Sequence, residues 1–292
     1  MATISVLGAG LMGAALVRAF ARGGHAISVW NRTPHKAKAL EAEGVRMAPT
    51  LLDATDADLI VDIVSDYGVS GELLRDAKVA RALRGKTVLE LATGTPAEAA
   101  RAAAWASEHG IRYLDGAILA TPDAIGTPGC TILYSGPREI FDQHSATLSA
   151  IADSGMYVGP AIGHANVLDN AILAMLWGTV QGTLLGAAIC EVESFPLASF
   201  RQALEGSWPV VLPLLLAALG RVADRRWAAA KDTQSTLGPC IASARHIAEI
   251  TKQHGLDSTL PEAFLGIFQR AVDAGHRDDD VAAAYVGMLP RA

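Results

Sequence analysis

A glycine-rich turn near the start of the chain limits its fold more than any other feature. Residues 3–7 form a short apolar run, and the letters that follow are GAGLMG and then AALVRAFARGG. A strand, a turn and a helix in that order, with Gly8, Gly10 and Gly13 at G-x-G-x-x-G spacing, is typical of a unit that holds a pyrophosphate at a helix N-terminus. Gly8 permits the tight turn, Gly10 lets the backbone approach the phosphates, and Gly13 lets helix and strand pack closely.

The region after this turn indicates which dinucleotide the unit takes. Residues 25–30 read as a second strand, which ends about 20 residues after the glycine turn, where the adenosine ribose is read in such folds. The residues there are Asn31, Arg32 and Thr33, with Lys36 one helical step further on, and no acid stands among them. Two cations suit a 2′-phosphate, so we expect NADP(H) rather than NAD. The alternative is that both cations are ordinary solvated surface.

Strand-like and helix-like runs alternate through the first half of the chain. Residues 58–64, 86–92 and 111–119 read as strands, and helical stretches separate them. This alternation predicts a doubly wound parallel sheet of the Rossmann type, which two further apolar segments complete. Ligands bind at the carboxyl ends of the strands in such sheets. The expected cofactor residues are therefore Gly8, Gly10, Leu11, Met12, Gly13, Asn31, Arg32, Thr33, Lys36, Val64, Ser65 and Thr93.

The second half of the chain has a different pattern. After Gly163 the strand signals stop, and long segments rich in alanine and leucine follow with a helical period. We expect an NADP-binding Rossmann domain at residues 1–161 and an all-helical domain for substrate binding and dimerisation at 162–292. A long helix at about residues 163–192 would join them. The acidic run HRDDD, residues 276–280, reads as a solvated helix start.

Composition and charge exclude several classes of protein. A net charge of −6 with interspersed signs gives no broad basic surface, so we expect no nucleic-acid partner. Three widely spaced cysteines indicate neither disulfides nor a zinc site, and we expect no metal. The N-terminus lacks a basic n-region and a cleavage site, which favours a cytoplasmic protein.

One apolar stretch raises the alternative of a membrane span. Residues 171–190 carry no formal charge and have about the length that crosses a bilayer. Polar residues precede the stretch, Gln181 interrupts it, Glu191 and Glu193 follow it, and no basic flank sets an orientation. We therefore expect no membrane and a buried helix of a domain core or a dimer interface.

Several motifs together resemble a known family. They are GAGLMG, NRTPHK, LELATGTP, YLDGAILATPDAIGTPGCTILYSG and GHANVLDNAIL. The chain is similar to the imine reductases and reductive aminases, which are relatives of the β-hydroxyacid dehydrogenases. The likeness covers the N-terminal domain and the start of the inter-domain helix. It implies a dimer in which the C-terminal helices of one chain help to close the cleft of the other, that is, a domain-swapped homodimer.

The resemblance gives Asp169 a catalytic role. β-Hydroxyacid dehydrogenases carry a lysine at this place, and they have a serine-glycine-glycine carboxylate clamp where this chain has Ala120, Thr121 and Pro122. A lysine stabilises the oxyanion formed from a carbonyl, whereas an ionised aspartate favours the iminium cation that accepts hydride. The resemblance therefore implies that Asp169 anchors the amine or iminium and handles its proton. The alternative is an acid that caps the helix near its first turn.

The resemblance also implies a set of substrate-binding residues: Thr93, Leu119, Thr121, Leu173, Trp177, Trp208 and Gln234. Trp177 lies eight residues after Asp169, at about the place where reductive aminases often have a tyrosine. The loss of that hydroxyl favours preformed cyclic imines over ketone plus amine. Plain core packing is an equal alternative for Trp177, and simple packing is also an alternative for Trp208.

The leading hypothesis is thus NADPH-dependent reduction of imines to amines by hydride transfer, including reductive amination of ketones with amines. One alternative is a keto reductase that resembles β-hydroxyacid dehydrogenases; it requires a cationic proton donor near Asp169, and the sequence offers no lysine there. The other alternative is a non-catalytic NADP(H)-binding sensor.

Overall fold

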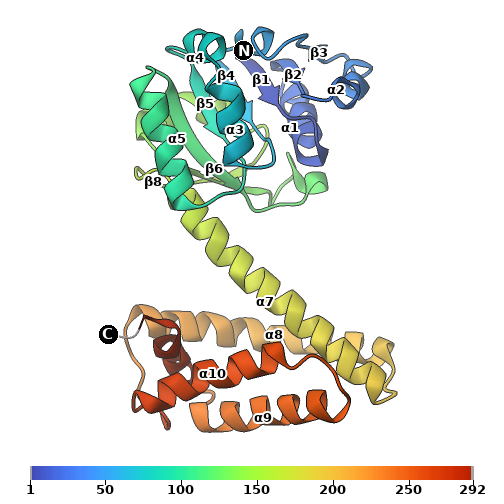
Figure 1. Ribbon diagram of the computed structural model, residues 1–292, viewed down its shortest axis with the longest axis vertical. Helices are drawn as coiled ribbons and strands as arrows, with labels where there is room; N and C mark the ends of the chain where they lie inside the picture. Colours follow the sequence, from blue (N-terminus) through green and yellow to red (C-terminus); the bar gives the residue numbers. More distant parts are fainter. Residues whose placement is uncertain (1, 291–292) are drawn as a thin grey trace. The chain divides into compact units, whose positions relative to one another are not determined.

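The computed structural model describes residues 2–290. The chain forms two compact units, which meet within helix α7 between Met175 and Leu176 (Figure 1). The predicted combination of an α/β N-terminal part and a helical C-terminal part is confirmed. The described strands of the first unit are β1 Thr3–Leu7, β2 Ala26–Trp30, β3 Arg46–Met47, β4 Leu59–Asp62, β5 Thr87–Glu90, β6 Arg112–Ile118, β7 Thr131–Ser135 and β8 Ser154–Gly159.

The helices of the first unit lie between these strands. They are α1 Leu11–Arg22, α2 Pro34–Glu41, α3 Tyr67–Leu74, α4 Ala77–Ala82, α5 Pro96–Glu108 and α6 Arg138–Leu148, with 3-10 turns η1 Asp53–Thr55 and η2 Pro122–Ala124. Among the described residues, the strands form one eight-stranded sheet in the order β3-β2-β1-β4-β5-β6-β7-β8.

The sheet differs from the fully parallel one that the sequence predicts. β7 pairs with β6 in antiparallel register, with Asp115 opposite Ser135, whereas the other neighbouring strands run parallel. The reason lies in the connection. Residues 119–130 contain the short turn η2 in place of a crossover helix, and a parallel pair requires a longer crossover. With β7 reversed in this way, β7 and β8 still belong to the same sheet as β1 to β6.

Side chains of the central strands alternate between two cores, one on each face of the sheet. Val61 and Leu89 join a cluster with residues of α1 and α6, whereas Ile60 and Val88 join a cluster with residues of α3, α4 and α5. This period of two follows from the pleat of a β-strand. Each cluster is buried, because helices cover both faces of the sheet.

Local hydrogen bonds fix the start of α5 beside the end of β5. The Thr95 hydroxyl accepts from the Glu98 amide, and the Glu98 carboxylate accepts from the Thr95 amide at 2.8 Å, which is a capping box. Pro96 follows as the first helical residue, where its fixed φ suits a helix and its missing N–H costs nothing. The turn at residues 93–95 is therefore held firmly at the carboxyl edge of the sheet.

The second unit is helical. Its helices are the remainder of α7 His164–Val192, then α8 Leu197–Ala223, α9 Leu237–Gln253, α10 Thr259–Asp273 and the 3-10 segment η3 Val281–Met288. Leu237, Ala271 and Ala283 form its buried centre, with Trp227 and Phe268 packed against them.

The two long helices α7 and α8 expose much apolar surface. In α7 the buried residues are Ala165, Asn166 and Asp169, all within the first two turns. Both helices are long and apolar enough to cross a membrane by length and composition. Of the two expected places for residues 171–190, the core of the chain's own domain is wrong, because Trp177 and Leu184 are each 58% exposed, and a dimer interface stays a prediction. Burial of this stretch requires a surface that the chain itself does not supply.

Candidate active site

A pocket of about 420 Å³ lies at the carboxyl ends of β1, β2 and β4. Every residue expected to bind the cofactor lines this pocket, except Thr93, which follows the end of β5. The pocket also contains four residues that the sequence did not single out: Trp30, Ile63, Val69 and Leu73. Trp30 and Ile63 adjoin expected residues along the chain. Val69 and Leu73 lie four residues apart and share one face of α3.

The glycine turn has the geometry that close approach to a phosphate requires. Gly8 has a φ of +112°, and a Cβ there would lie 2.6 Å from the Ile63 carbonyl oxygen. A Cβ on Gly13 would lie 2.0 Å from the Gly8 carbonyl oxygen, so helix α1 could not pack against the turn. Around a Cβ on Gly10 no described atom lies within 4 Å, which leaves that side open. These features fit a pyrophosphate at the N-terminus of α1.

The turn after β2 presents two cations to the same pocket. The Asn31 side chain is engaged internally: its Oδ1 accepts from the Ala9 amide at 2.8 Å and its Nδ2 donates to the Thr33 carbonyl at 2.9 Å. Asn31 therefore ties this turn to the glycine turn. Arg32 and Lys36 are exposed, line the pocket and form no ion pair with any residue that the structure describes. They fit the role of ligands for a 2′-phosphate.

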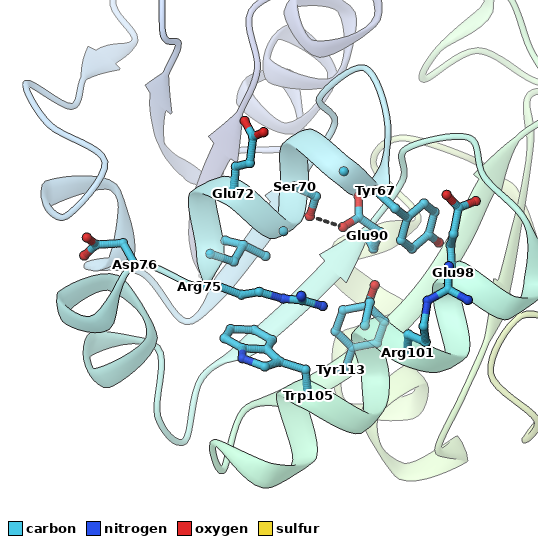
Figure 2. Close-up of a pocket in the computed structure, with 14 residues that line it drawn as sticks. Tyr67, Ser70, Glu72, Arg75, Asp76, Glu90, Glu98, Arg101, Trp105 and Tyr113 are labelled. Atoms are coloured by element: carbon cyan, nitrogen blue, oxygen red, sulfur yellow. Dashed lines mark hydrogen bonds between the residues drawn. The ribbon is translucent and has the colours of Figure 1, made fainter.

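A row of buried acids runs across three neighbouring strands. Asp62 of β4 stands opposite Glu90 of β5, which stands opposite Asp115 of β6, and all three are fully buried. The Ser70 hydroxyl of α3 bonds Asp62 at 2.8 Å. It also bonds Glu90, as Figure 2 shows. One hydroxyl carries one proton, so one of these two contacts needs a protonated carboxyl as its donor. Burial raises the pKa of Asp62 to about 6 and that of Glu90 well above its usual value.

The third acid connects the sheet to the start of α7. The Tyr67 hydroxyl and the Asn166 side chain both donate to the Asp115 carboxylate, the latter at 3.0 and 3.1 Å. The Asn166 Oδ1 in turn accepts from the Gly94 amide at 3.2 Å, and Asn170 donates to the Gly94 carbonyl at 2.9 Å. The turn that carries Thr93 is thus fastened to the first two turns of α7.

Asp169 lies in these same two turns. Its side chain is 3% exposed, and its carboxylate accepts no hydrogen bond from the described part of the chain. Burial raises the pKa of this carboxyl above its usual value. Leu119 and Leu168 both pack against a small buried cluster that includes Ala165, in the first turn of the same helix. The structure therefore brings Thr93, Leu119 and Asp169 to the first turns of α7.

The other expected substrate residues are more widely spread. Thr121 precedes η2 in an exposed position, and Leu173 is half-buried on α7. Trp177, Trp208 and Gln234 belong to the second unit, where the two tryptophans are 58% and 41% exposed and Gln234 is also exposed. Their binding roles stay predictions.

Comparison with known proteins identifies the family. Residues 3–159 match the family described as the NAD binding domain of 6-phosphogluconate dehydrogenase, and residues 161–289 match the C-terminal domain of the NADPH-dependent reductive aminase-like family. An NADPH-dependent reductive aminase of Aspergillus oryzae is 31% identical over 96% of this chain and 95% of its own length. The chain belongs to the imine reductase and reductive aminase family.

Solved structures of this family superpose on the whole chain. An imine reductase from Myxococcus stipitatus in complex with NADP+ has a TM-score of 0.95 and 38% identity, and the match covers 98% of this chain and 100% of that one. A reductive aminase from Aspergillus terreus in complex with NADPH and ethyl levulinate has a TM-score of 0.90 and 28% identity over 99% and 100% of the two chains.

Sequence reasoning missed the acid row in this imine reductase family member. A signal was present, because three strand-like runs each carry an acid after three other residues: LIVD, TVLE and RYLD. Three acids at matching places in neighbouring parallel strands must lie side by side. The partners Ser70 and Asn166 were not predictable, because they come from helices whose placement depends on the tertiary fold.

Proposed function

We propose that this enzyme reduces iminium cations to amines and that Asp169 holds the cationic nitrogen and handles its proton. Members of its family are NADPH-dependent oxidoreductases that act on C=N bonds, and this chain is one of them. When bound, NADPH supplies the hydride. One observation carries the role of Asp169: a buried carboxylate with no protein partner among the described residues stands in the first turns of α7.

Electrostatics supports a nitrogen substrate over a carbonyl. Two opposite charges about 4 Å apart attract by on the order of 4 kcal/mol at an effective dielectric of 20. An ionised Asp169 thus stabilises an iminium cation and opposes the oxyanion that forms from a ketone. The whole of α7 contains neither lysine nor arginine, so no cation on this helix offsets the carboxylate. Burial raises the pKa of Asp169, which makes its carboxylate a better proton acceptor than an exposed one.

Substrate preference within the family is a finer proposal. The Aspergillus oryzae relative is a reductive aminase, so ketone plus amine belongs to the wider substrate range of the family. Trp177 of this chain has an indole N–H, which donates but cannot relay a proton as a hydroxyl does. We therefore expect preformed cyclic imines to react faster than a ketone with a free amine.

The assembly that we propose is a cytoplasmic, domain-swapped homodimer. The exposed apolar residues of α7 and α8 support this homodimer, because a contiguous apolar surface on a single chain usually marks a site of interaction. A second copy would bury these helices and bring its own C-terminal helices to the cleft of its partner. The proposed substrates are small imines, or ketones with amines, and we propose neither nucleic acid nor membrane as a partner.

The test uses two pyrrolines that differ in how they gain their charge. 2-Methyl-1-pyrroline must be protonated to become an iminium, whereas 1,2-dimethyl-1-pyrrolinium is permanently charged. We expect Asp169→Asn to lower kcat/KM for the first by roughly 10²- to 10⁴-fold. The loss of kcat/KM for the second substrate should be smaller, because its nitrogen is already cationic and needs no proton from Asp169. The readout is NADPH oxidation, and Asp153→Asn, an exposed acid, is the matched control.

Three outcomes would contradict the proposal. If Asp169→Asn left both pyrrolines unaffected, Asp169 would be a helix cap. Turnover of a 3-keto acid in preference to imines would favour the dehydrogenase-like alternative. Binding of NADPH without turnover of any imine would favour the sensor.

A further inference from the structure

A second pocket of the first unit lies between α3 and α5. Its volume is about 650 Å³, within the range of small-molecule sites, and residues of α3, β5, α5 and β6 line it (Figure 2). No residue assigned above to the cofactor or to the substrate lines it. The pocket therefore has no role in the proposed reaction.

Two arginines line this pocket without forming an ion pair in the described part of the chain. Arg75 follows α3 and lies over the ring of Trp105, 5.7 Å from its centroid, and Arg101 comes from α5. Neither guanidinium forms an ion pair with a described residue. The acids nearby are directed elsewhere: in Figure 2 the carboxylates of Glu72 and Asp76 point away from the hollow.

Glu98, the third acid near the opening, is already engaged. Its carboxylate accepts from the amide and the hydroxyl of Thr95, at 2.8 and 2.7 Å. Glu98 also attracts Arg101, which lowers the pKa of its carboxyl, but it forms no ion pair with this guanidinium in the described part of the chain. Both arginines therefore keep their hydrogen-bond donors for a ligand. Arginine is well suited to such a ligand because its planar guanidinium pairs with a carboxylate through two parallel hydrogen bonds.

The inner wall is aromatic and offers one unused hydroxyl. Tyr113 is 6% exposed, and its hydroxyl has no hydrogen-bond partner among the described residues. Figure 2 shows this hydroxyl pointing toward Tyr67 and Glu90, with the end of Arg75 to one side. Behind it, Glu90 and Ser70 bond each other. Burial raises the pKa of Glu90 well above its usual value, which favours the uncharged form of this carboxyl behind the wall.

We propose that this pocket is a second small-molecule site and that it binds a flat aromatic compound with a single carboxylate. The arginines hold the carboxylate, Tyr113 donates its free hydroxyl, and the rings of Trp105 and the tyrosines contact the aromatic body. A dianion such as phosphate fits less well. Phosphate has no aromatic body that could contact Trp105 and the tyrosines.

Helix α3 connects this site to the cofactor pocket. Val69 and Leu73 face the cofactor pocket, whereas Ser70 and Leu74 face the second pocket. A ligand that shifts α3 therefore changes the affinity for NADPH, and NADPH changes the affinity for that ligand by the same factor. This coupling rests on the proposed function, whereas the binding itself does not.

The probe for the site is 2-naphthoate, titrated by calorimetry into the full-length enzyme saturated with NADPH. Saturation keeps the probe out of the cofactor pocket. We expect saturable binding that falls at least about tenfold in the double variant Arg75→Gln/Arg101→Gln, because two charge-assisted contacts are lost. Tyr113→Phe should weaken it several-fold. Arg81→Gln, an exposed arginine of α4 outside the pocket, is the matched control and should leave the affinity unchanged.

Neutral and inorganic probes complete the test. 2-Naphthamide should bind at least about tenfold more weakly than the acid, and inorganic phosphate should not displace it. The proposal is overturned if 2-naphthoate fails to bind at millimolar concentration, if excess NADPH abolishes its binding, or if the arginine variants bind it as well as wild type. The coupling alone is overturned if saturating 2-naphthoate leaves the Kd of NADPH unchanged.

Discussion

Arg32 and Lys38 are exposed cations six residues apart, and of the two Arg32 lines the cofactor pocket. We expect Arg32→Asp to lower kcat/KM with NADPH by roughly 10- to 100-fold, because the charge-assisted hydrogen bond that we predict from Arg32 to the 2′-phosphate would be lost. The activity with NADH should change little or rise, since an aspartate accepts from a free 2′-hydroxyl.

Lys38→Asp is the control for this prediction, because it makes the same change of charge on α2 outside the pocket. Initial rates with each cofactor, measured for both variants, give the ratio of the two specificity constants. A ratio that stays at its wild-type value in Arg32→Asp would contradict the assignment of the 2′-phosphate site.

The buried acid row makes a prediction about pH and stability. Burial raises the pKa of Asp62 from 3.8 to about 6, and that of Glu90 also rises. Between about pH 4 and pH 6 the native state therefore holds protons that the unfolded chain has released. The free energy of unfolding must fall as the pH rises through this range, by on the order of 3 kcal/mol for one such carboxyl.

Glu90→Gln tests this prediction because it keeps the shape and a hydrogen bond to Ser70 but removes one titrating group. We expect the apparent urea midpoint of the variant to depend less on pH between 4.5 and 7.5 than that of wild type. Glu108→Gln, at the exposed end of α5, should retain the wild-type dependence. Equal slopes in all three proteins would mean that the acid row does not exchange its protons in this range.

At the scale of elements, the sequence predicts what depends on neighbours along the chain. The period of two in the strands and the glycine turn are local, and the sheet and the cofactor pocket follow from them. Contacts between distant segments are not local. Nothing in the letters of residues 119–130 states that β7 turns antiparallel, and nothing near Asp115 names Asn166 as its partner, 51 residues later.

The run HRDDD shows the same limit in the second unit. The sequence predicts a solvated helix start at residues 276–280. In the structure Asp280 caps η3 through the Ala282 amide, as a helix start requires, but it is 4% exposed rather than solvated. It is buried because Arg221 of α8 reaches it, with Nε 3.2 Å from Oδ2. The residues around Asp280 do not indicate a partner that lies 59 residues earlier in the chain.

This buried pair joins α8 to η3, so its loss should loosen the second unit. Arg221→Met leaves the buried Asp280 without its cation, which costs about 3 to 5 kcal/mol. The matched control is Arg201→Met, whose partner Glu205 lies on the same helix in an exposed pair worth about 0.3 to 0.5 kcal/mol. Thermal unfolding followed by tryptophan fluorescence compares the two. A similar loss of Tm in both would contradict a structural role for the buried pair.

At the scale of the whole molecule, the apolar surface of α7 and α8 decides the assembly. A single chain leaves Leu184 of α7 58% exposed and Leu216 of α8 60% exposed. A soluble monomer rarely tolerates such a surface over two long helices, and both a second copy and a lipid bilayer could cover it. Experiment can distinguish the two partners, because a dimer has a fixed mass and forms without lipid.

Sedimentation velocity without detergent should give a species of twice 30.4 kDa that persists at micromolar concentration. Leu184→Glu places a charge within the apolar surface, so the variant should sediment as a monomer. It should also lose most of its imine turnover, because in the proposed homodimer the partner chain helps to close the cleft. Leu52→Glu, a 43% exposed leucine of the first unit, should keep the dimer and the activity. A wild-type monomer, or flotation with phosphatidylcholine vesicles, would contradict the homodimer and favour a lipid-facing role for α7 and α8.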